Sequence, residues 1–130
     1  MPGRAFPIWA WVAGGSALGG VLRHAAGLMA APPWPTLAVN VAGSFAIAIY
    51  WALTGPDGRV LVAPRYRFAV MAGLCGGLTT FSMFGIEFWS MMLEGARGAA
   101  GAYLLVSATL WLLAAAAGMF AGKWINGARR

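Results

Sequence analysis

The 130-residue chain has the length of one domain, and its composition excludes an ordinary water-soluble protein. Hydrophobic residues make up 61% of the chain and charged residues only 9%, which is too little charge to solvate a soluble surface. The net charge of +6 is explained by lipid headgroups and the positive-inside rule, because the basic residues stand between apolar runs. We therefore expect a membrane protein with no nucleic-acid partner and no separate catalytic domain.

Four apolar runs, each about as long as one helical crossing of a bilayer, lie at residues 8–30, 36–54, 68–92 and 100–121. Prolines follow the first run, and a Gly55-Pro56-Asp57-Gly58 turn follows the second. Because backbone polar groups must be paired within hydrocarbon, runs of this length are expected as helices. The sequence predicts an all-α integral membrane protein, with one four-helix domain over residues 1–130.

The basic residues are unevenly distributed between the two sides that four spans would create. One side would carry seven of them, namely Arg4, Arg59, Arg65, Arg67, Lys123, Arg129 and Arg130, against Arg97 and the membrane-edge Arg23 on the other. This distribution predicts both chain termini on the cytoplasmic side.

The third run is interrupted by small and hydroxyl residues halfway along its length. Gly73, Gly76 and Gly77 are followed by Thr79, Thr80 and Ser82, where an uninterrupted helix would be expected. We predict a broken helix near residues 76–82, whose freed backbone groups could hold an ion. The alternative is an intact helix whose glycines permit close packing and whose threonines bond to the preceding turn. Gly15 and Gly19, four residues apart, predict close helix packing as well.

Side chains suited to an ion path follow the predicted break. Phe81 and Phe84 are three residues apart, and Glu87 continues the same row on a helix. The electropositive edges of aromatic rings can face an anion, although packing in the core or against lipid is the commoner role. Glu87 is the only carboxylate within a predicted span, and a role at a pore exit and a helix-end hydrogen bond both remain open.

The other predicted spans contribute further polar groups. Asn40 on the second span can donate to a ligand or join helices. On the fourth span, Tyr103 and Ser107 lie one turn apart and align two hydroxyl donors. Arg23 can extend into the headgroups or attract anions to a vestibule.

No motif of a hydrolase or a phosphate-binding enzyme is present, so we expect no enzymatic activity. Three functions remain from the residues alone: an ion channel, a small proton-coupled multidrug exporter, and a non-transporting membrane assembly subunit. An exporter of that type needs a membrane-embedded carboxylate, normally on its first helix, and here only Glu87 is available.

The string Gly76-Gly77-Leu78-Thr79-Thr80-Phe81-Ser82 strongly resembles the signature of the Fluc (CrcB) fluoride channels. Two further strings match that family in the expected order: Gly19-Gly20-Val21-Leu22-Arg23, and the stretch from Pro35 through Asn40 to Phe45. The resemblance covers nearly the whole chain. It implies a multi-pass protein of the bacterial inner membrane that passively exports fluoride, as an antiparallel dimer with two pores and a central structural sodium ion.

The resemblance also implies a role for each matching residue. Backbone carbonyls of Gly76 and Thr79 from both subunits would hold the sodium ion. The fluoride pores would be lined by Asn40, Phe81, Phe84, Tyr103 and Ser107, with Arg23 at an aqueous vestibule.

The sequence departs from the family pattern in three places. Met83 and Gly85 stand where hydroxyl residues are usual, and Trp111, one turn beyond Ser107, is expected to end the polar track early. In addition, the seven-to-two charge bias opposes equal insertion in both orientations. Either an identical chain or an oppositely oriented paralogue could therefore be the partner, and we favour the homodimer.

Overall fold

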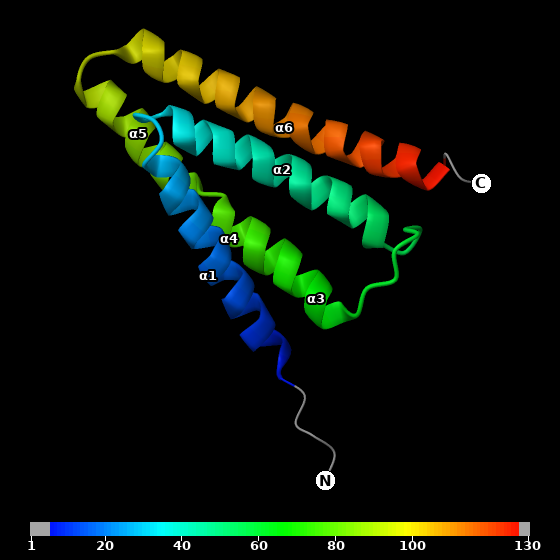
Figure 1. Ribbon diagram of the computed structural model, residues 1–130. Coiled ribbons are helices and arrows are strands. Elements are labelled where there is room, and N and C mark those ends of the chain that lie inside the picture. Colours follow the sequence, from blue (N-terminus) through cyan, green and yellow to red (C-terminus); the bar gives the residue numbers. More distant parts are fainter. Residues whose placement is uncertain (1–5, 128–130) are drawn as a thin grey trace.

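The computed structural model describes residues 6–127, so Arg4, Arg129 and Arg130 of the charge count lie outside the described residues. All regular structure in this part is helical (Figure 1). The elements are α1 (Ile8–Gly27), α2 (Trp34–Thr54), α3 (Pro64–Phe68), η1 (Ala69–Cys75), α4 (Gly76–Leu78), α5 (Phe81–Leu93) and α6 (Arg97–Gly127). Elements α3 to α5 together form the third predicted span.

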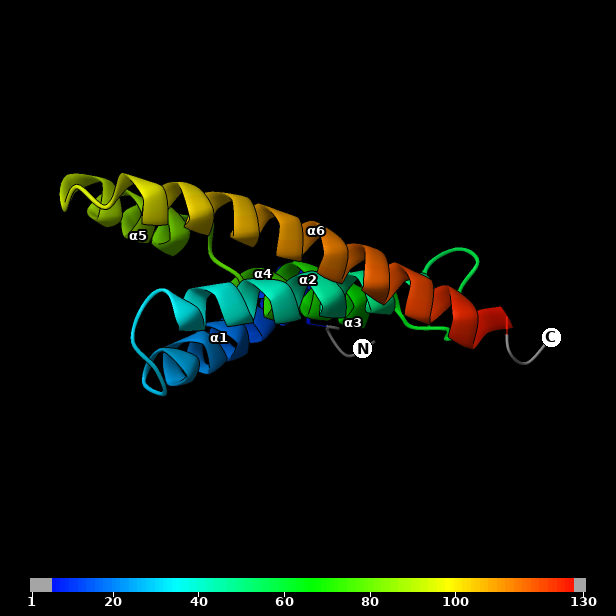
Figure 2. The same cartoon turned by 90° about the horizontal axis from the view of Figure 1, so that it is seen from above.

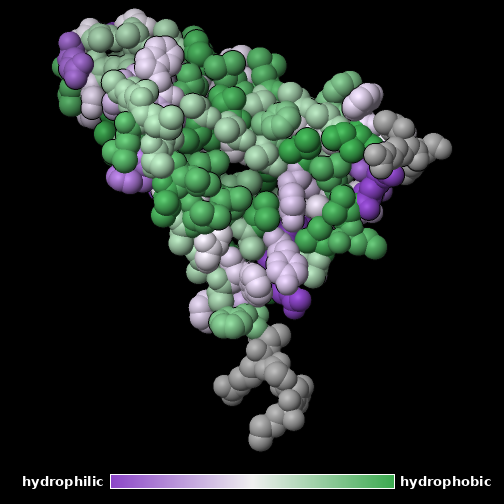
Figure 3. Space-filling view, in the orientation of Figure 1, coloured by the Kyte–Doolittle hydropathy of each residue, from purple (hydrophilic) through white to green (hydrophobic). Residues whose placement is uncertain are grey.

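Three of these helical segments are long and apolar enough to cross a membrane: α2, the combined segment Pro64–Leu93, and α6. Helix α1 has 20 residues, which is the length of a crossing, but it is not in this group. The reason is its composition, since Arg23, His24 and several glycines lower its hydropathy. The visible surface along the helices is mostly hydrophobic, as lipid contact requires (Figure 3).

Glycines bring α1 into backbone contact with the first half of the third span. A Cβ atom added at Gly15 would overlap the Ala69 carbonyl, and one added at Gly19 would overlap the Leu74 carbonyl. From the other side, a Cβ at Gly77 would overlap the Ser16 carbonyl. A Cβ at Gly73 would likewise overlap the Val12 carbonyl. Gly15 and Gly19 therefore face Gly73 and Gly77, which confirms the close packing expected from Gly15 and Gly19.

Helices α2 and α6 form the other long contact, and they lie side by side in Figure 1. Gly118 of α6 lies against the Phe45 carbonyl, and Gly122 lies against the side chain of Ala52. The sequence analysis did not single out this second pair of glycines. Helix α6 extends beyond the predicted residues 100–121 at both of its ends. Helix α1 ends before residue 30, which was its predicted end.

The third span is broken at Thr79 and Thr80, as predicted. Thr79 (φ −80°, ψ 155°) and Thr80 (φ −151°, ψ 119°) are both extended, between α4 and α5. The break lets the chain change partners: η1 and α4 pack on α1, whereas α5 packs on α6. Figure 2 shows the thin connection passing from the layer of α1 and α4 to that of α6. The π-helix η1 just before the break was not foreseen.

Candidate functional site

Asn40 binds both backbone polar groups of Thr80 at the break. Its side-chain oxygen accepts from the Thr80 backbone N–H at 2.7 Å, and its side-chain nitrogen donates to the Thr80 carbonyl at 2.9 Å. Asn40 lies on α2 and is only 5% exposed. Through these two bonds its amide replaces helical hydrogen bonds that the break removes. The joining role considered for Asn40 is therefore present, and the second N–H of its amide nitrogen remains free for another acceptor.

The same bond releases the carbonyl of Gly76. In a continuous helix the Thr80 N–H would donate to the Gly76 carbonyl four residues earlier, but here it donates to Asn40. The Thr79 carbonyl, which follows the end of α4, accepts from Nη1 of Arg23 at 3.1 Å. A carbonyl oxygen has two lone pairs, so the Thr79 carbonyl keeps one for a further ligand.

Arg23 therefore reaches the centre of the third span rather than only the headgroups. It comes from α1, 56 residues away in sequence, and it is partly buried. Its guanidinium places a permanent positive charge next to the broken backbone.

The Thr80 side chain begins the second half of the span. Its hydroxyl oxygen accepts from the backbone N–H of Met83 at 3.2 Å, which makes Thr80 the N-cap of α5. The hydroxyl of Thr79 donates back to the Cys75 carbonyl at 2.9 Å. Both threonines thus form hydroxyl hydrogen bonds within the third span, whereas their backbone groups bond to side chains of other helices.

Glu87 joins three helices through two hydroxyl groups. Thr36 of α2 donates to one carboxyl oxygen at 2.7 Å, and Tyr103 of α6 donates to the other at 2.6 Å. Glu87 is only 9% exposed, and its partners come from other helices. Its hydrogen bonds are therefore tertiary ones, rather than the helix-end bond that the sequence left open.

The aromatic side chains gather around Phe84, which is 4% exposed. Its ring centroid lies 5.1 Å from that of Tyr103 and 4.9 Å from that of Trp111, whose ring meets it nearly edge to face. Phe81 is 5.5 Å from Phe84 by the same measure but is 75% exposed. Phe81 thus extends from this cluster to the outside of the single chain.

Two polar atoms near this cluster have no hydrogen-bond partner within the described residues. They are the hydroxyl of Ser107 and the indole nitrogen of Trp111, both buried. Leaving a buried donor unpaired costs roughly 1–3 kcal/mol, so such a group calls for an explanation.

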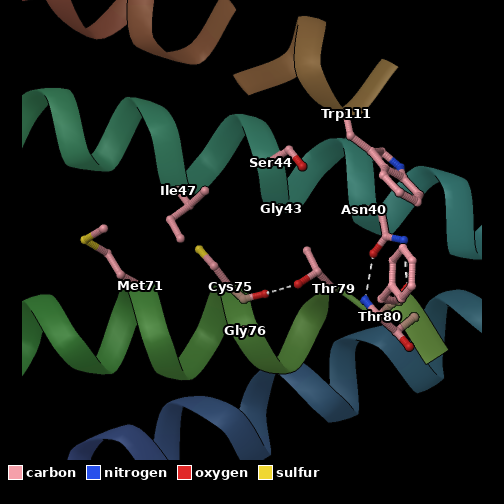
Figure 4. Close-up of a pocket in the computed structure, with 11 residues that line it drawn as sticks. Asn40, Gly43, Ser44, Ile47, Met71, Cys75, Gly76, Thr79, Thr80 and Trp111 are labelled. Atoms are coloured by element: carbon pink, nitrogen blue, oxygen red, sulfur yellow. Dashed lines mark hydrogen bonds between the residues drawn. The ribbon is translucent and has the colours of Figure 1, made fainter. Parts of the chain in front are cut away.

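Two cavities flank the break. One of about 270 Å³ lies between α2, the third span and α6, and its walls include Asn40, Ser44, Thr79, Thr80, Phe81 and Trp111 (Figure 4). The other, of about 400 Å³, lies on the α1 side and includes Arg23, His24, Thr36, Thr80, Met83 and Glu87. Thr80 contributes to both walls, so the two cavities lie on either side of the break.

The structure thus brings the predicted polar residues together around one region, from four helices. Thr36 was missed as a site residue because it marked only the start of the second run. Its distance of 51 residues from Glu87 leaves no sequence signal for their pairing. Met83 lines the second cavity, whereas a Cβ atom added at Gly85 would meet nothing within 4 Å.

Comparison with known proteins identifies relatives over most of the chain. Residues 10–119 match the family model described as CrcB-like protein, Camphor Resistance (CrcB). The chain is 43% identical over 114 residues to fluoride-specific ion channel FluC 1 of Bradyrhizobium diazoefficiens, covering 85% of this chain and 80% of that protein.

Two further relatives have the same degree of similarity. Fluoride-specific ion channel FluC 3 of Brucella abortus is 45% identical over 118 residues, covering 86% of each chain. Fluoride-specific ion channel FluC of Paramagnetospirillum magneticum is 43% identical over 124 residues, covering 91% of this chain and 97% of the relative. The match thus includes the broken span, Asn40 and the residues around Glu87. The chain therefore belongs to the CrcB family.

Proposed function

We propose that this chain is a fluoride channel that passively exports fluoride from the cytoplasm and so protects the cell from its toxicity. The observation that carries the proposal is the similarity, over four fifths or more of both lengths, to relatives named fluoride-specific ion channels. These relatives are bacterial and are named as channels rather than enzymes, and the chain is a multi-pass protein of the bacterial inner membrane.

The chemistry of the site supports an anion path. Fluoride is strongly hydrated, so a pore through hydrocarbon must offer hydrogen-bond donors in place of water. The free N–H of Asn40 and the unpaired hydroxyl of Ser107 are such donors. The phenol of Tyr103 belongs to the same proposed path but donates its hydrogen to Glu87. The ring edges of Phe81 and Phe84 add weaker positive potential along the same path.

The carbonyls of Gly76 and Thr79 fit the structural sodium ion that we propose as cofactor. The Gly76 oxygen is released by the break, and the Thr79 oxygen keeps one lone pair. The Arg23 guanidinium on that oxygen opposes a second positive charge, so sodium binding there requires the further carbonyl ligands of a second chain. Unwound backbone carbonyls are a recurrent ligand set for sodium in membranes. A sodium ion held there by two chains would supply positive charge that offsets the cost of nearby anions.

An antiparallel homodimer would complete this arrangement. Phe81 is largely exposed in the single chain although it belongs to the predicted pore, and a second chain is expected to cover it. Two carbonyls from one chain also provide too few ligands for a buried cation, whereas two chains provide four. The dimer would be surrounded by membrane lipid, which the mostly hydrophobic surface favours (Figure 3).

Fluoride efflux from liposomes tests the function directly. Purified protein is reconstituted in sodium-containing buffer, and efflux is followed with a fluoride electrode. We expect efflux well above that of protein-free vesicles, and equal rates would refute the channel.

Phe81→Ile and Phe84→Ile are expected to lower fluoride efflux at least about tenfold, because isoleucine keeps the apolar bulk but removes the aromatic ring edges. Phe120→Ile is the matched control for Phe81→Ile, since Phe120 on α6 is 73% exposed and Phe81 is 75% exposed. Size-exclusion chromatography of each variant checks that the assembly is unchanged. Normal efflux from both test variants would remove these rings from the pore.

The two other functions predict no fluoride efflux and are told apart by further measurements. A proton-coupled exporter would move protons in response to drugs, with Glu87 as its carboxylate. A non-transporting assembly subunit would show neither ion efflux nor proton movement, and it would copurify with another membrane protein.

A further inference from the structure

One histidine, His24, lines the cavity on the α1 side of the break, and it is the only histidine in the chain. It lies in the last turn of α1 directly after Arg23, and it is exposed. The cavity has a volume of about 400 Å³, and Thr80 and Glu87 also belong to its wall. His24 therefore shares one cavity with the residues at the break.

The charges around this cavity balance without His24. Arg23 contributes a permanent positive charge. Both carboxyl oxygens of Glu87 accept hydrogen bonds, from Thr36 and Tyr103, as the oxygens of a negatively charged carboxylate do. Among the described residues, no other charged side chain lines the cavity. Protonation of His24 therefore decides whether the cavity is neutral or carries a net positive charge.

The elements packed on α1 add no further charge to this cavity within the described residues. Helix α2 contributes Thr36 and Val39 to its wall, and the third span contributes Thr80 and Met83 besides Glu87. The other charged or titratable groups of the elements in contact with α1 are Tyr50, Arg65, Tyr66, Arg67 and Cys75.

These other groups lie away from His24. Tyr66 packs on Trp11 with ring centroids 4.9 Å apart, and Trp11 precedes His24 by 13 residues, or about 20 Å along α1. Tyr50 lies 14 residues after Thr36, or about 21 Å along α2. Cys75 is buried and lines the other cavity. Because the Debye length is about 8 Å at physiological ionic strength, the charges carried by α3 are largely screened from the cavity.

We propose that His24 recruits anions to this cavity when it is protonated, and that fluoride efflux through the channel therefore rises as the pH falls. An imidazole gains its positive charge as the pH falls through about 6.5. A net positive charge in a confined cavity raises the local concentration of anions and the rate at which they enter. The effect depends on charge and not on a directed hydrogen bond, so it holds whichever ring nitrogen faces the cavity. This inference rests on the proposed channel function and adds a residue to those that the family resemblance implies.

The size of the cavity sets the expected size of the effect. A sphere of 400 Å³ is about 9 Å across, and one unit charge acting over that distance in water changes the local anion concentration about twofold. The less polar walls of the cavity strengthen the interaction, so we expect about a twofold to fourfold change.

Three forms of the full-length chain test the inference in sodium-containing liposomes with the same pH on both sides. Efflux is measured with a fluoride electrode at pH values of about 8 and about 6, on either side of the titration of an imidazole. The rate of protein-free vesicles at each pH is subtracted, because hydrogen fluoride crosses lipid unaided. We expect the unmodified protein to release fluoride about twofold to fourfold faster at the lower pH. His24→Gln is expected to keep the slow rate at both pH values, and His24→Arg, the matched variant with a permanent charge, the fast rate at both.

Ionic strength gives a second readout, because recruitment by charge is screened by salt. Raising the ionic strength from about 0.15 M to about 1 M with an impermeant salt, at constant sodium concentration, shortens the Debye length from about 8 Å to about 3 Å. The difference between the two pH values is expected to disappear. A difference of the same size at high salt would overturn the inference.

The outcomes separate this inference from the proposed function. If the unmodified protein releases no fluoride at either pH, the channel function fails and this inference fails with it. If the unmodified protein conducts equally at both pH values, or if His24→Gln retains the pH dependence, only the role of His24 is refuted.

Chemical modification covers the case in which the variants do not fold. Diethyl pyrocarbonate transfers an ethoxycarbonyl group to an imidazole nitrogen, and hydroxylamine removes it. On the reconstituted unmodified protein, the reagent is expected to give the slow rate at both pH values, and hydroxylamine is expected to restore the pH dependence. Because the chain has one histidine, a pH dependence that survives complete modification, as checked by mass spectrometry, would overturn the inference.

Discussion

Single polar side chains in this chain hold together segments that are far apart in sequence. Asn40 completes the hydrogen bonds of Thr80, and Arg23 donates to the neighbouring carbonyl of Thr79. Glu87 accepts from Thr36 and so connects α5 to α2. In hydrocarbon, where water is scarce, such pairings decide whether a polar group is tolerated.

The bond between Thr36 and Glu87 can be tested with a matched pair of threonines on α2. Thr36→Val is expected to lower the free energy of unfolding by about 1–3 kcal/mol, because it leaves a buried carboxyl oxygen without its donor. Thr54→Val removes only a bond within α2, from the Thr54 hydroxyl to the Tyr50 carbonyl, and should have a smaller effect. Thermal unfolding in detergent measures both variants. Equal losses would mean that Glu87 gains nothing from Thr36.

At the scale of the elements, backbone contact through glycine joins the helices in two pairs. Gly15 and Gly19 lie against η1 and α4, and Gly118 lies against α2. Without a hydrophobic driving force between helices in lipid, close packing of this kind supplies much of the attraction.

Two glycines on α1 provide a direct test of that packing. A Cβ at Gly19 would overlap the carbonyl of Leu74, whereas a Cβ at Gly14 would meet nothing within 4 Å. Gly19→Ala is therefore expected to destabilise the protein by about 1–3 kcal/mol. Gly14→Ala should be neutral or stabilising by up to about 1 kcal/mol, since alanine favours helix. Unfolding temperatures compare the two, and an unaffected Gly19→Ala variant would contradict the contact.

The sequence predicted the larger features of this fold but not the partners within the site. Apolar run lengths gave the helices, and the cluster of glycines and hydroxyls before Phe81 located the break. The partner of Arg23 could not be predicted, because its bond to Thr79 spans 56 residues and depends on how α1 packs. The channel roles proposed for Asn40 and Tyr103 come from family resemblance rather than from spacing.

At the scale of the whole molecule, the proposed antiparallel dimer requires the chain to insert in both orientations. The basic residues oppose this, because the predicted cytoplasmic side carries seven of them against two. The charge distribution and the family resemblance therefore give different expectations for the orientation of the chain in the membrane.

Cysteine labelling of intact cells decides between these expectations. Asp57 and Ala96 are exposed and lie in the loops before and after the third span, and the single native cysteine, Cys75, is buried. Insertion in both orientations predicts that a membrane-impermeant maleimide labels about half of the Asp57→Cys chains and about half of the Ala96→Cys chains. Complete labelling of one variant and none of the other would indicate a single orientation and refute the antiparallel homodimer.

The π-helical segment η1 contains one more residue per hydrogen-bonded turn than an α-helix would. Loss of one residue within 69–75 would let this segment become α-helical and leave Thr80 directed at Asn40. Loss of one residue between this segment and Thr80 would instead rotate the break by about 100° and separate Thr80 from Asn40. When relatives are aligned, a gap within residues 69–75 is therefore expected to preserve the site, and a gap at residues 76–79 is expected to change it.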